Sequence, residues 1–164
     1  MAELPTTEGF KKNSHLHKLL SLVAPLLLIG GCGAGMSNFE GTWSYTSGNT
    51  TITCPNIPAQ TSTLSGDETL AAAASGNGLE ITNSGGCNVS LTVSGSSATA
   101  SAGQTCSITE SGTTWTATLQ SWTFTTSDGK TATETVNATI SGTVSGQSIT
   151  CTVAETGALT KVSK

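Results

Sequence analysis

The amino-acid sequence predicts an all-β protein: an antiparallel up-and-down meander of about eight to ten strands, closed or nearly closed into a barrel. Threonine, serine and glycine dominate after residue 31, and threonine favours strands whereas glycine marks turns. The runs between glycine-bearing turns alternate apolar and polar residues, as half-buried strands do. Turn-set registers place the apolar residues of neighbouring runs opposite each other. The alternative is a two-sheet β-sandwich, but barrel closure hides strand edges best.

The segment 131–144 shows the alternation most clearly. Its inward side would carry Ala132, Val136, Ala138, Ile140, Gly142 and Val144. The other side carries threonine, serine and asparagine, so one side is predicted to be core and the other wet. The turn at residues 145–146 then places Ile140 opposite Cys151.

Further short turns are expected between the other strands, at residues 48–49, 83–85, 96–97 and 111–112. The cross-strand pairs that these turns imply include Trp43–Cys54, Leu79–Val89, Val93–Ala100 and Ile108–Trp115. In every hairpin one face stays apolar, which indicates a single meander. The alanine run 71–74 lies in strand-like surroundings, and we predict a strand there.

The turn at residues 127–129 leaves open the side on which two aromatic residues lie. A two-residue turn points Trp122 and Phe124 outward. A three-residue turn with Gly129 in the left-handed region, together with a bulge near residues 120–121, brings both rings inward. We favour the bulge, because two rings left in water would forgo much apolar burial. The alternatives are an exposed Trp122–Phe124 patch for a partner, or coverage of both rings by the C-terminal segment.

Four cysteines follow Cys32. An even number of cysteines in an exported chain indicates two disulfides, and three pairings are formally possible. The register favours Cys87–Cys106, across one hairpin, and Cys54–Cys151, between an early and a late strand. No histidine follows residue 31, so no zinc site is expected.

Residues 1–31 have the three-part layout of an export signal. Three lysines precede an apolar segment, residues 19–29, that is shorter than the roughly 20 residues a membrane-spanning helix needs. Small residues then precede Cys32, and residues 28–32 resemble the lipobox of bacterial lipoproteins. The resemblance implies cleavage before Cys32 and acylation of this cysteine, which would anchor the protein to a membrane. The alternative is an ordinary secretory signal cut near Gly35.

The lipobox resemblance also sets the expected domain organisation and location. Residues 32–38 would be the lipidated cysteine and a flexible tether, and residues 39–164 a single β domain. Gly33 stands where lipoproteins retained in the inner membrane carry Asp, so the resemblance implies the outer membrane of a Gram-negative cell envelope. The membrane is therefore the expected partner, through Cys32, and the sequence indicates no cofactor.

Charge and composition exclude several classes of function. After residue 31, three lysines stand against eight acidic residues, a net charge of about −5. Nucleic-acid binding is excluded, because it needs a basic stripe. Ser–His–Asp and Cys–His catalysis need a base that titrates near neutrality, and no histidine remains. The glycines mark hairpin turns rather than phosphate-binding loops. We therefore expect no catalytic residue and a protein that is not an enzyme.

One pair of acidic residues is a candidate ligand site. Glu134 and Glu155 both fall on the inward side, with Glu155 opposite Val136, so their titrations should couple near one barrel mouth. Paired acids can bind a cation or, at a suitable spacing, hydrolyse glycosides. The simpler interpretation is two mouth residues in water. Asp67 and Glu68 are expected in a solvated turn without a metal ion.

Residues 39–43, Phe-Glu-Gly-Thr-Trp, resemble the Gly-x-Trp signature that opens the first strand of lipocalins and related calycin barrels. The resemblance implies that Trp43 plugs one barrel end and that the cavity binds small apolar molecules. Lipocalins also stack a late Arg on this Trp. The chain has no Arg, and Lys161 is the residue that could take its place. The simpler role for Trp43 is that of a core residue beside Cys54.

Taken together, these patterns predict a lipid-anchored cell-envelope protein with a non-catalytic barrel that binds a small apolar ligand. A dry interior cavity with Trp43 or Trp115 in its wall would mark such binding. The alternative is a structural or protein-interaction module of the cell surface. A filled interior and an exposed patch at Trp122 and Phe124 would mark that alternative.

Overall fold

The computed structural model describes residues 35–82, 88–110 and 113–164. A short 3₁₀ helix, η3 (Met36–Asn38), precedes ten strands in the described part of the chain. The strands are β1 (Gly41–Thr53), β2 (Gln60–Thr63), β3 (Asp67–Ala72), β4 (Leu79–Thr82), β5 (Asn88–Ser94), β6 (Ser97–Ala100), β7 (Thr105–Glu110), β8 (Thr113–Thr125), β9 (Thr131–Val144) and β10 (Gln147–Ser163).

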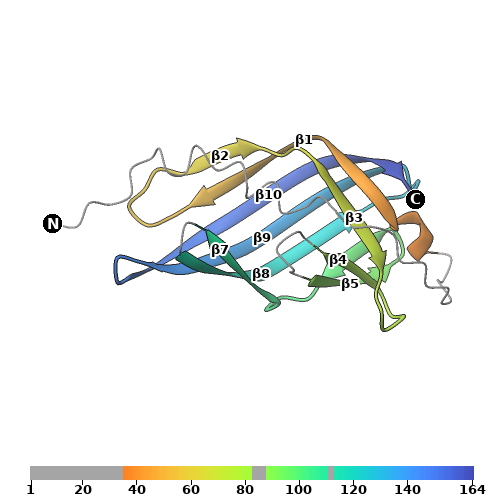
Figure 1. Cartoon of the computed structure of the whole chain (residues 1–164). Coiled ribbons are helices and arrows are strands. Elements are labelled where there is room, and N and C mark those ends of the chain that lie inside the picture. Colours follow the sequence, from red (N-terminus) through yellow and green to blue (C-terminus); the bar gives the residue numbers. More distant parts are fainter. Residues whose placement is uncertain (1–34, 83–87, 111–112) are drawn as a thin grey trace.

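Eight of the described strands form a closed antiparallel barrel (Figure 1). Their order is β1–β3–β4–β5–β6–β8–β9–β10, and β10 pairs back onto β1 from Thr42 to Thr53. This closure confirms the predicted up-and-down meander barrel, and the sandwich alternative is wrong. Closure also removes free edges from the eight-stranded part.

The barrel is longer on one side than on the other. The edge of β1 that carries β3 also carries β2, and the edge of β8 that carries β6 also carries β7. Strands β1, β8, β9 and β10 therefore run on past the barrel, and with β2 and β7 they form an open, six-stranded extension. Figure 1 shows this extension on the left, with the turn between β9 and β10 at its tip, and η3 at the opposite, closed end.

Aromatic residues fill the closed end of the barrel. Phe39, Trp43 and Phe124 are fully buried, and the Trp43 and Phe124 rings meet edge to face at 5.1 Å between centroids. Such pairs add about 0.5–1.5 kcal/mol to the burial of their area. The same cluster contains Leu70, Leu79, Ile81, Leu91, Ala98, Ala132 and Leu159. This end of the barrel is therefore packed with side chains.

The C-terminal strands have the register that the sequence predicts. Ile140 pairs with Cys151 across β9 and β10, and Ile108 pairs with Trp115 across β7 and β8. The register of β8 against β9 shifts between Leu119 and Ser121, which is the predicted bulge, and Gly129 has a positive φ of 64°. With the bulge, the second half of β8 turns its aromatic residues toward the core.

The predicted hairpin at residues 48–49 is wrong, because β1 passes through it as one strand. The register of β1 against β10 instead shifts between Tyr45 and Ser47. Gly48, at φ 152°, lies against β10 so closely that a Cβ would stand 2.6 Å from the carbonyl oxygen of Thr156. A tight turn and a close approach of two strands share a need for glycine, and here the glycine allows β1 to lie close to β10.

Two other hairpins pair two residues away from the expected register. Leu79 pairs with Leu91 instead of Val89, and Val93 pairs with Ala98 instead of Ala100. A slip of two residues leaves every side chain on its expected face, so the core is unchanged. The predicted strand in the alanine run exists as far as Ala72, the end of β3.

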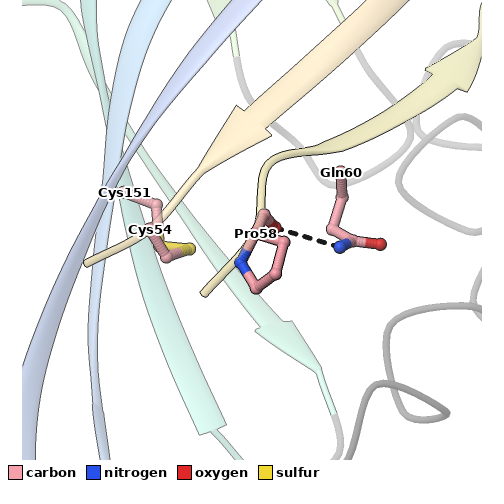
Figure 2. The surroundings of a disulfide bond; sticks show 4 residues. All are labelled: Cys54, Pro58, Gln60 and Cys151. Atoms are coloured by element: carbon pink, nitrogen blue, oxygen red, sulfur yellow. Dashed lines mark hydrogen bonds between the residues drawn. A yellow bond between two sulfur atoms is a disulfide. The ribbon is translucent and has the colours of Figure 1, made fainter. Parts of the chain in front are cut away.

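A disulfide joins Cys54 to Cys151 across 97 residues of chain, as predicted. Figure 2 shows it where the chain leaves β1, close to Pro58 and Gln60. Cys106 is also disulfide-bonded. Cys87 lies outside the described residues, so the pair Cys87–Cys106 stays a prediction.

Candidate functional site

Four polar residues from four strands meet in the middle of the barrel, above the aromatic plug. We call them the acidic cluster: Tyr45 of β1, Glu68 of β3, Glu134 of β9 and Glu155 of β10. The register brings them together, because Trp43, one inward position before Tyr45, pairs with Glu68, and Val136, one inward position after Glu134, pairs with Glu155.

The bulge in β1 adds Thr50 to the inward side next to the cluster. Trp43 and Tyr45 point inward before the bulge, and Thr50 points inward after it, although its residue number has the other parity. The Tyr45 ring then lies over Gly157, where a Cβ would stand 2.7 Å from ring atom Cε1. A side chain at position 157 would therefore push the phenol out of the cluster.

The Tyr45 hydroxyl lies among three carboxyl groups. It donates a short hydrogen bond to Oε2 of Glu134, and it lies 3.3 Å from Oε2 of Glu68 and 3.4 Å from Oε1 of Glu155. Thr50 Oγ1 donates to the other oxygen of Glu155 at 2.8 Å. A phenol has one proton, so it cannot donate to all three carboxyls at once, and additional protons must be shared within the cluster.

Burial sets the protonation of the cluster. Glu68 is 0% exposed and Glu134 is 2% exposed. Burial raises the pKa of Glu68, and the charges of Glu134 and Glu155 raise it further. Burial raises the pKa of Glu134 to about 8, and the hydrogen bond from Tyr45 offsets part of that effect. The pKa of Tyr45 is also raised, first by burial and then by the charges of the three acids.

Three buried polar atoms around the cluster lack a hydrogen-bond partner. Among the described residues these atoms are Oε1 of Glu68, Oε1 of Glu134 and Nε1 of Trp122. The Trp122 indole lies beside Glu134 and lowers its pKa, although its N–H does not reach hydrogen-bond geometry. Buried polar atoms are normally paired, so unpaired ones in a group mark a place where the fold alone does not explain the residues.

A second polar arrangement seals the closed end. Lys161 Nζ lies 4.7 Å from the centre of the Trp43 ring and donates to the carbonyl oxygens of Asn38 and Glu40 at 2.7 and 2.8 Å. The Trp43 indole donates to the carbonyl oxygen of Phe39 at 2.7 Å. Lys161 thus lies on Trp43, at the position that the Gly-x-Trp resemblance gives to a late Arg. Its partial burial lowers the pKa of its ammonium group.

The structure places the other predicted site residues apart from the cluster or inside the core. Trp43 lies in the plug, and Trp115 lies in the open extension against Gly142, where a Cβ would meet its ring at 2.6 Å. The alternative of an exposed aromatic patch is wrong, because Phe124 is fully buried and Trp122 is partly buried against the core. Cys32 lies outside the described residues.

The prediction for the acidic residues was right in register and wrong in environment. Glu134 and Glu155 do lie together, with Glu155 opposite Val136, but Glu134 is buried rather than in water at a mouth. Glu68 is buried too, and not in a solvated turn. Glu68 lies two residues before the apolar Leu70 and therefore on the same face of β3, and this spacing could have predicted that Glu68 points inward.

The described residues contain no group of three or more His, Cys, Asp or Glu side chains arranged to hold a metal ion. None of the described helices is long and apolar enough to cross a membrane. The chain matches no protein-family model, no curated protein and no solved structure.

Proposed function

We propose that this chain is a lipid-anchored cell-envelope protein whose barrel binds a small molecule without converting it. The observation that carries the proposal is the acidic cluster, in which three carboxyl groups surround one phenol inside the barrel. Burial of the Glu68 and Glu134 carboxyl groups costs stability, and apolar residues of similar size would pack as well. Strongly shifted titratable groups concentrate at functional sites, so binding is the better explanation of their presence.

A ligand would reach the cluster from the open extension. The closed end is filled by Phe39, Trp43 and Phe124, all fully buried. On the other side of the cluster, the inward residues of β9 and β10, among them Ala138 and Val153, are only half-buried. A ligand that enters from this side would meet these apolar residues before the acids, which suits a ligand with an apolar part.

The anchor at Cys32 would hold the closed end close to the membrane. Helix η3 begins at Met36, four residues after Cys32, and four extended residues span at most about 14 Å. Because η3 lies at the closed end, the open extension would point away from the lipid (Figure 1). This orientation leaves the route to the cluster free.

The anchor is tested by metabolic labelling with a radioactive fatty acid and by membrane fractionation. We expect the wild-type chain to incorporate the label and to sediment with membranes, and Cys32→Ser to do neither. Gly35→Ser is the matched control, because it also introduces a serine near the processing site but keeps Cys32, and a Cβ at this position meets nothing within 4 Å. An unlabelled, freely soluble wild-type product would contradict the anchor and favour the alternative secretory signal.

Binding is tested by thermal unfolding of the purified full chain against a panel of small amphiphiles of positive, negative and no charge. A ligand at 100 times its Kd stabilises the folded state by about 2.7 kcal/mol. We expect at least one compound to raise the melting temperature, and Glu68→Leu to reduce that shift while the variant stays folded. A panel without any stabilising compound would contradict a binding function.

The unpaired strand edges favour a second candidate, a protein-interaction module. In the described part of the chain, β2 pairs with β1 alone and β7 pairs with β8 alone, and all four residues of β2 are exposed. An exposed edge can accept a strand from a partner. Replacing Thr61, in the middle of β2, with Pro would remove a backbone donor. The test is chemical cross-linking of the wild type and of Thr61→Pro to any protein partner. Loss of the cross-linked product in Thr61→Pro, with unchanged ligand binding, would support this candidate.

A further inference from the structure

The acidic cluster presents hydrogen-bond acceptors, and none of the three lysines in the described part of the chain is engaged with it. Oε1 of Glu68 and Oε1 of Glu134 have no partner at hydrogen-bond distance and angle, although the two carboxyl groups lie close enough to affect each other's pKa, and both side chains are at least 98% buried. Of the described lysines, Lys130 and Lys164 are exposed. Lys161 is engaged at the closed end with the carbonyl groups of Asn38 and Glu40. A binding partner for the cluster must therefore bring donors and positive charge.

The shape and chemistry of the cluster favour an organic cation over a metal ion. The carboxyl groups are not arranged as the ligands of a metal ion, as noted above for the described residues. Instead they surround a phenol, with the Trp122 indole beside Glu134. An ammonium group offers three donors, and aromatic rings beside carboxylates attract such a group through cation–π contact as well as through charge.

The burial gradient sets the direction in which such a ligand would lie. Glu68 and Glu134 are buried, whereas Glu155 and Tyr45 are half-buried and lie nearer the open extension. The half-buried apolar residues Ala138 and Val153 follow on that side, one pair further along β9 and β10 than Val136 and Glu155. A charged group at the acids would thus leave an apolar chain among these residues.

We infer that Glu68, Glu134 and Glu155 with Tyr45 bind the ammonium group of a small organic amine whose apolar chain extends along β9 and β10. This inference deepens the proposed binding function and rests on it. In the ligand-free protein, protons shared within the cluster take the place of the cation. Binding of an ammonium ion then releases protons from the carboxyl groups, so the affinity rises as the pH is raised.

The experiment is calorimetric titration of the detergent-solubilised full chain with four probes: hexylammonium, hexanol, hexanoate and calcium ion. We expect hexylammonium to bind at least tenfold more tightly than hexanol at pH 8. We also expect its affinity to rise about tenfold or more from pH 6 to pH 8.5, over which Glu134 loses its proton and the amine stays charged. Heats measured in two buffers of different ionisation enthalpy will show the proton release.

Variants connect the preference to the cluster. Glu68→Gln and Glu134→Gln should each reduce the preference for hexylammonium over hexanol at least tenfold. Glu80→Gln is the matched control, since Glu80 lies on β4 outside the cluster and should keep the wild-type preference. Near-ultraviolet circular dichroism of the buried Trp43 verifies the fold of each variant. The comparison of probes on the wild type does not depend on any variant.

Three results would overturn the inference, and they differ in what they mean for the proposed function. Equal binding of hexanol and hexylammonium would leave a binding site without an ammonium preference. Calcium binding that Glu134→Gln abolishes, with no binding of hexylammonium, would make the cluster a metal site. Absence of binding by all four probes would overturn the inference and would also weaken the proposed binding function itself.

Discussion

At the scale of single residues, two polar groups of the barrel, those of Lys161 and Tyr45, differ in how completely their hydrogen bonds are satisfied. At the closed end, the ammonium group of Lys161 donates hydrogen bonds to two carbonyl groups and lies on the face of Trp43. The Tyr45 hydroxyl lies near three carboxyl groups but has a single proton to donate. The first arrangement is structural, because its contacts are complete, and the second is the candidate site, because its contacts are not.

Replacement of Lys161 by Met should therefore lower the stability of the fold. The variant keeps much of the alkyl chain but loses the cation–π contact and two hydrogen bonds, a loss of about 1–3 kcal/mol. Urea denaturation followed by tryptophan fluorescence measures it. Lys130→Met is the matched control, because the Lys130 side chain is exposed, and its stability should stay within about 0.5 kcal/mol of the wild type. Equal effects of the two variants would show that the ammonium group of Lys161 contributes nothing.

At the scale of the elements, two bulges decide which side chains reach the interior. The bulge in β8 was predictable, because Trp122 and Phe124 would otherwise lie in water. The bulge in β1 was not predictable, since Gly48 followed by Asn49 has the composition of a tight turn. Only pairing with β10, which is far away in sequence, makes this segment continue as a strand. Local composition favoured the turn, and tertiary pairing overrode it.

The same limit explains how much of the candidate site the sequence could predict. Glu134 and Glu155 follow from the alternation in two adjacent strands joined by a short turn, so their closeness was predictable. Tyr45 and Glu68 join them only through barrel closure, which brings β1 and its neighbour β3 to β10 and which no local pattern specifies. Two of the four members of the acidic cluster were therefore within reach of the sequence, along with the barrel itself.

Gly48→Ala should destabilise the protein by about 2–3 kcal/mol, because a Cβ would stand 2.6 Å from the Thr156 carbonyl oxygen and 2.8 Å from Cα of Gly157. Thermal and urea unfolding measure the loss. Gly103→Ala separates crowding from backbone strain, because Gly103 also has a positive φ, 87°, but meets nothing within 4 Å. The control should lose only about 1 kcal/mol. If both variants lost the same amount, close packing of β1 on β10 would not be the cause.

At the scale of the whole molecule, the barrel is closed around acids that hold their protons. Glu68 and Glu134 have a pKa above the ordinary value, and that of Glu134 is about 8. The unfolded chain loses these protons near pH 4.3. Between about pH 4.3 and 8 the folded protein therefore binds more protons than the unfolded chain, and by linkage its stability must fall as the pH rises.

We accordingly expect the free energy of unfolding to be highest near pH 4.5 and to decline toward pH 8.5, opposite to the acid-labile behaviour common among proteins. Urea denaturation at four pH values across this range measures the slope. Glu134→Gln, which is neutral throughout, should flatten the decline, and Glu80→Gln should leave it unchanged. A stability that rises from pH 4.5 to pH 8 would contradict protonation of the cluster in the folded state.

The Cys54–Cys151 bond fastens the seam between β1 and β10 over 97 residues. By chain entropy, a loop of this length is worth roughly 4–5 kcal/mol. The double variant Cys54→Ala and Cys151→Ala should lose on that order of stability, measured by urea denaturation without reductant. A loss below about 1 kcal/mol would show that the remaining pairing of β1 with β10 holds the seam without the cross-link.

The seam has a consequence for the order in which the chain can fold. Trp43 pairs with Lys161, so one edge of β1 has no native neighbour until β10 is present. A polypeptide that is threaded through a translocon amino end first exposes β1 early and β10 late. Completion of the barrel must then wait for the final strand, and a partly synthesised chain stays loose enough to be threaded. Circularity of the sheet thus delays completion of the fold until the last strand is present, as the proposed export to the cell envelope would require.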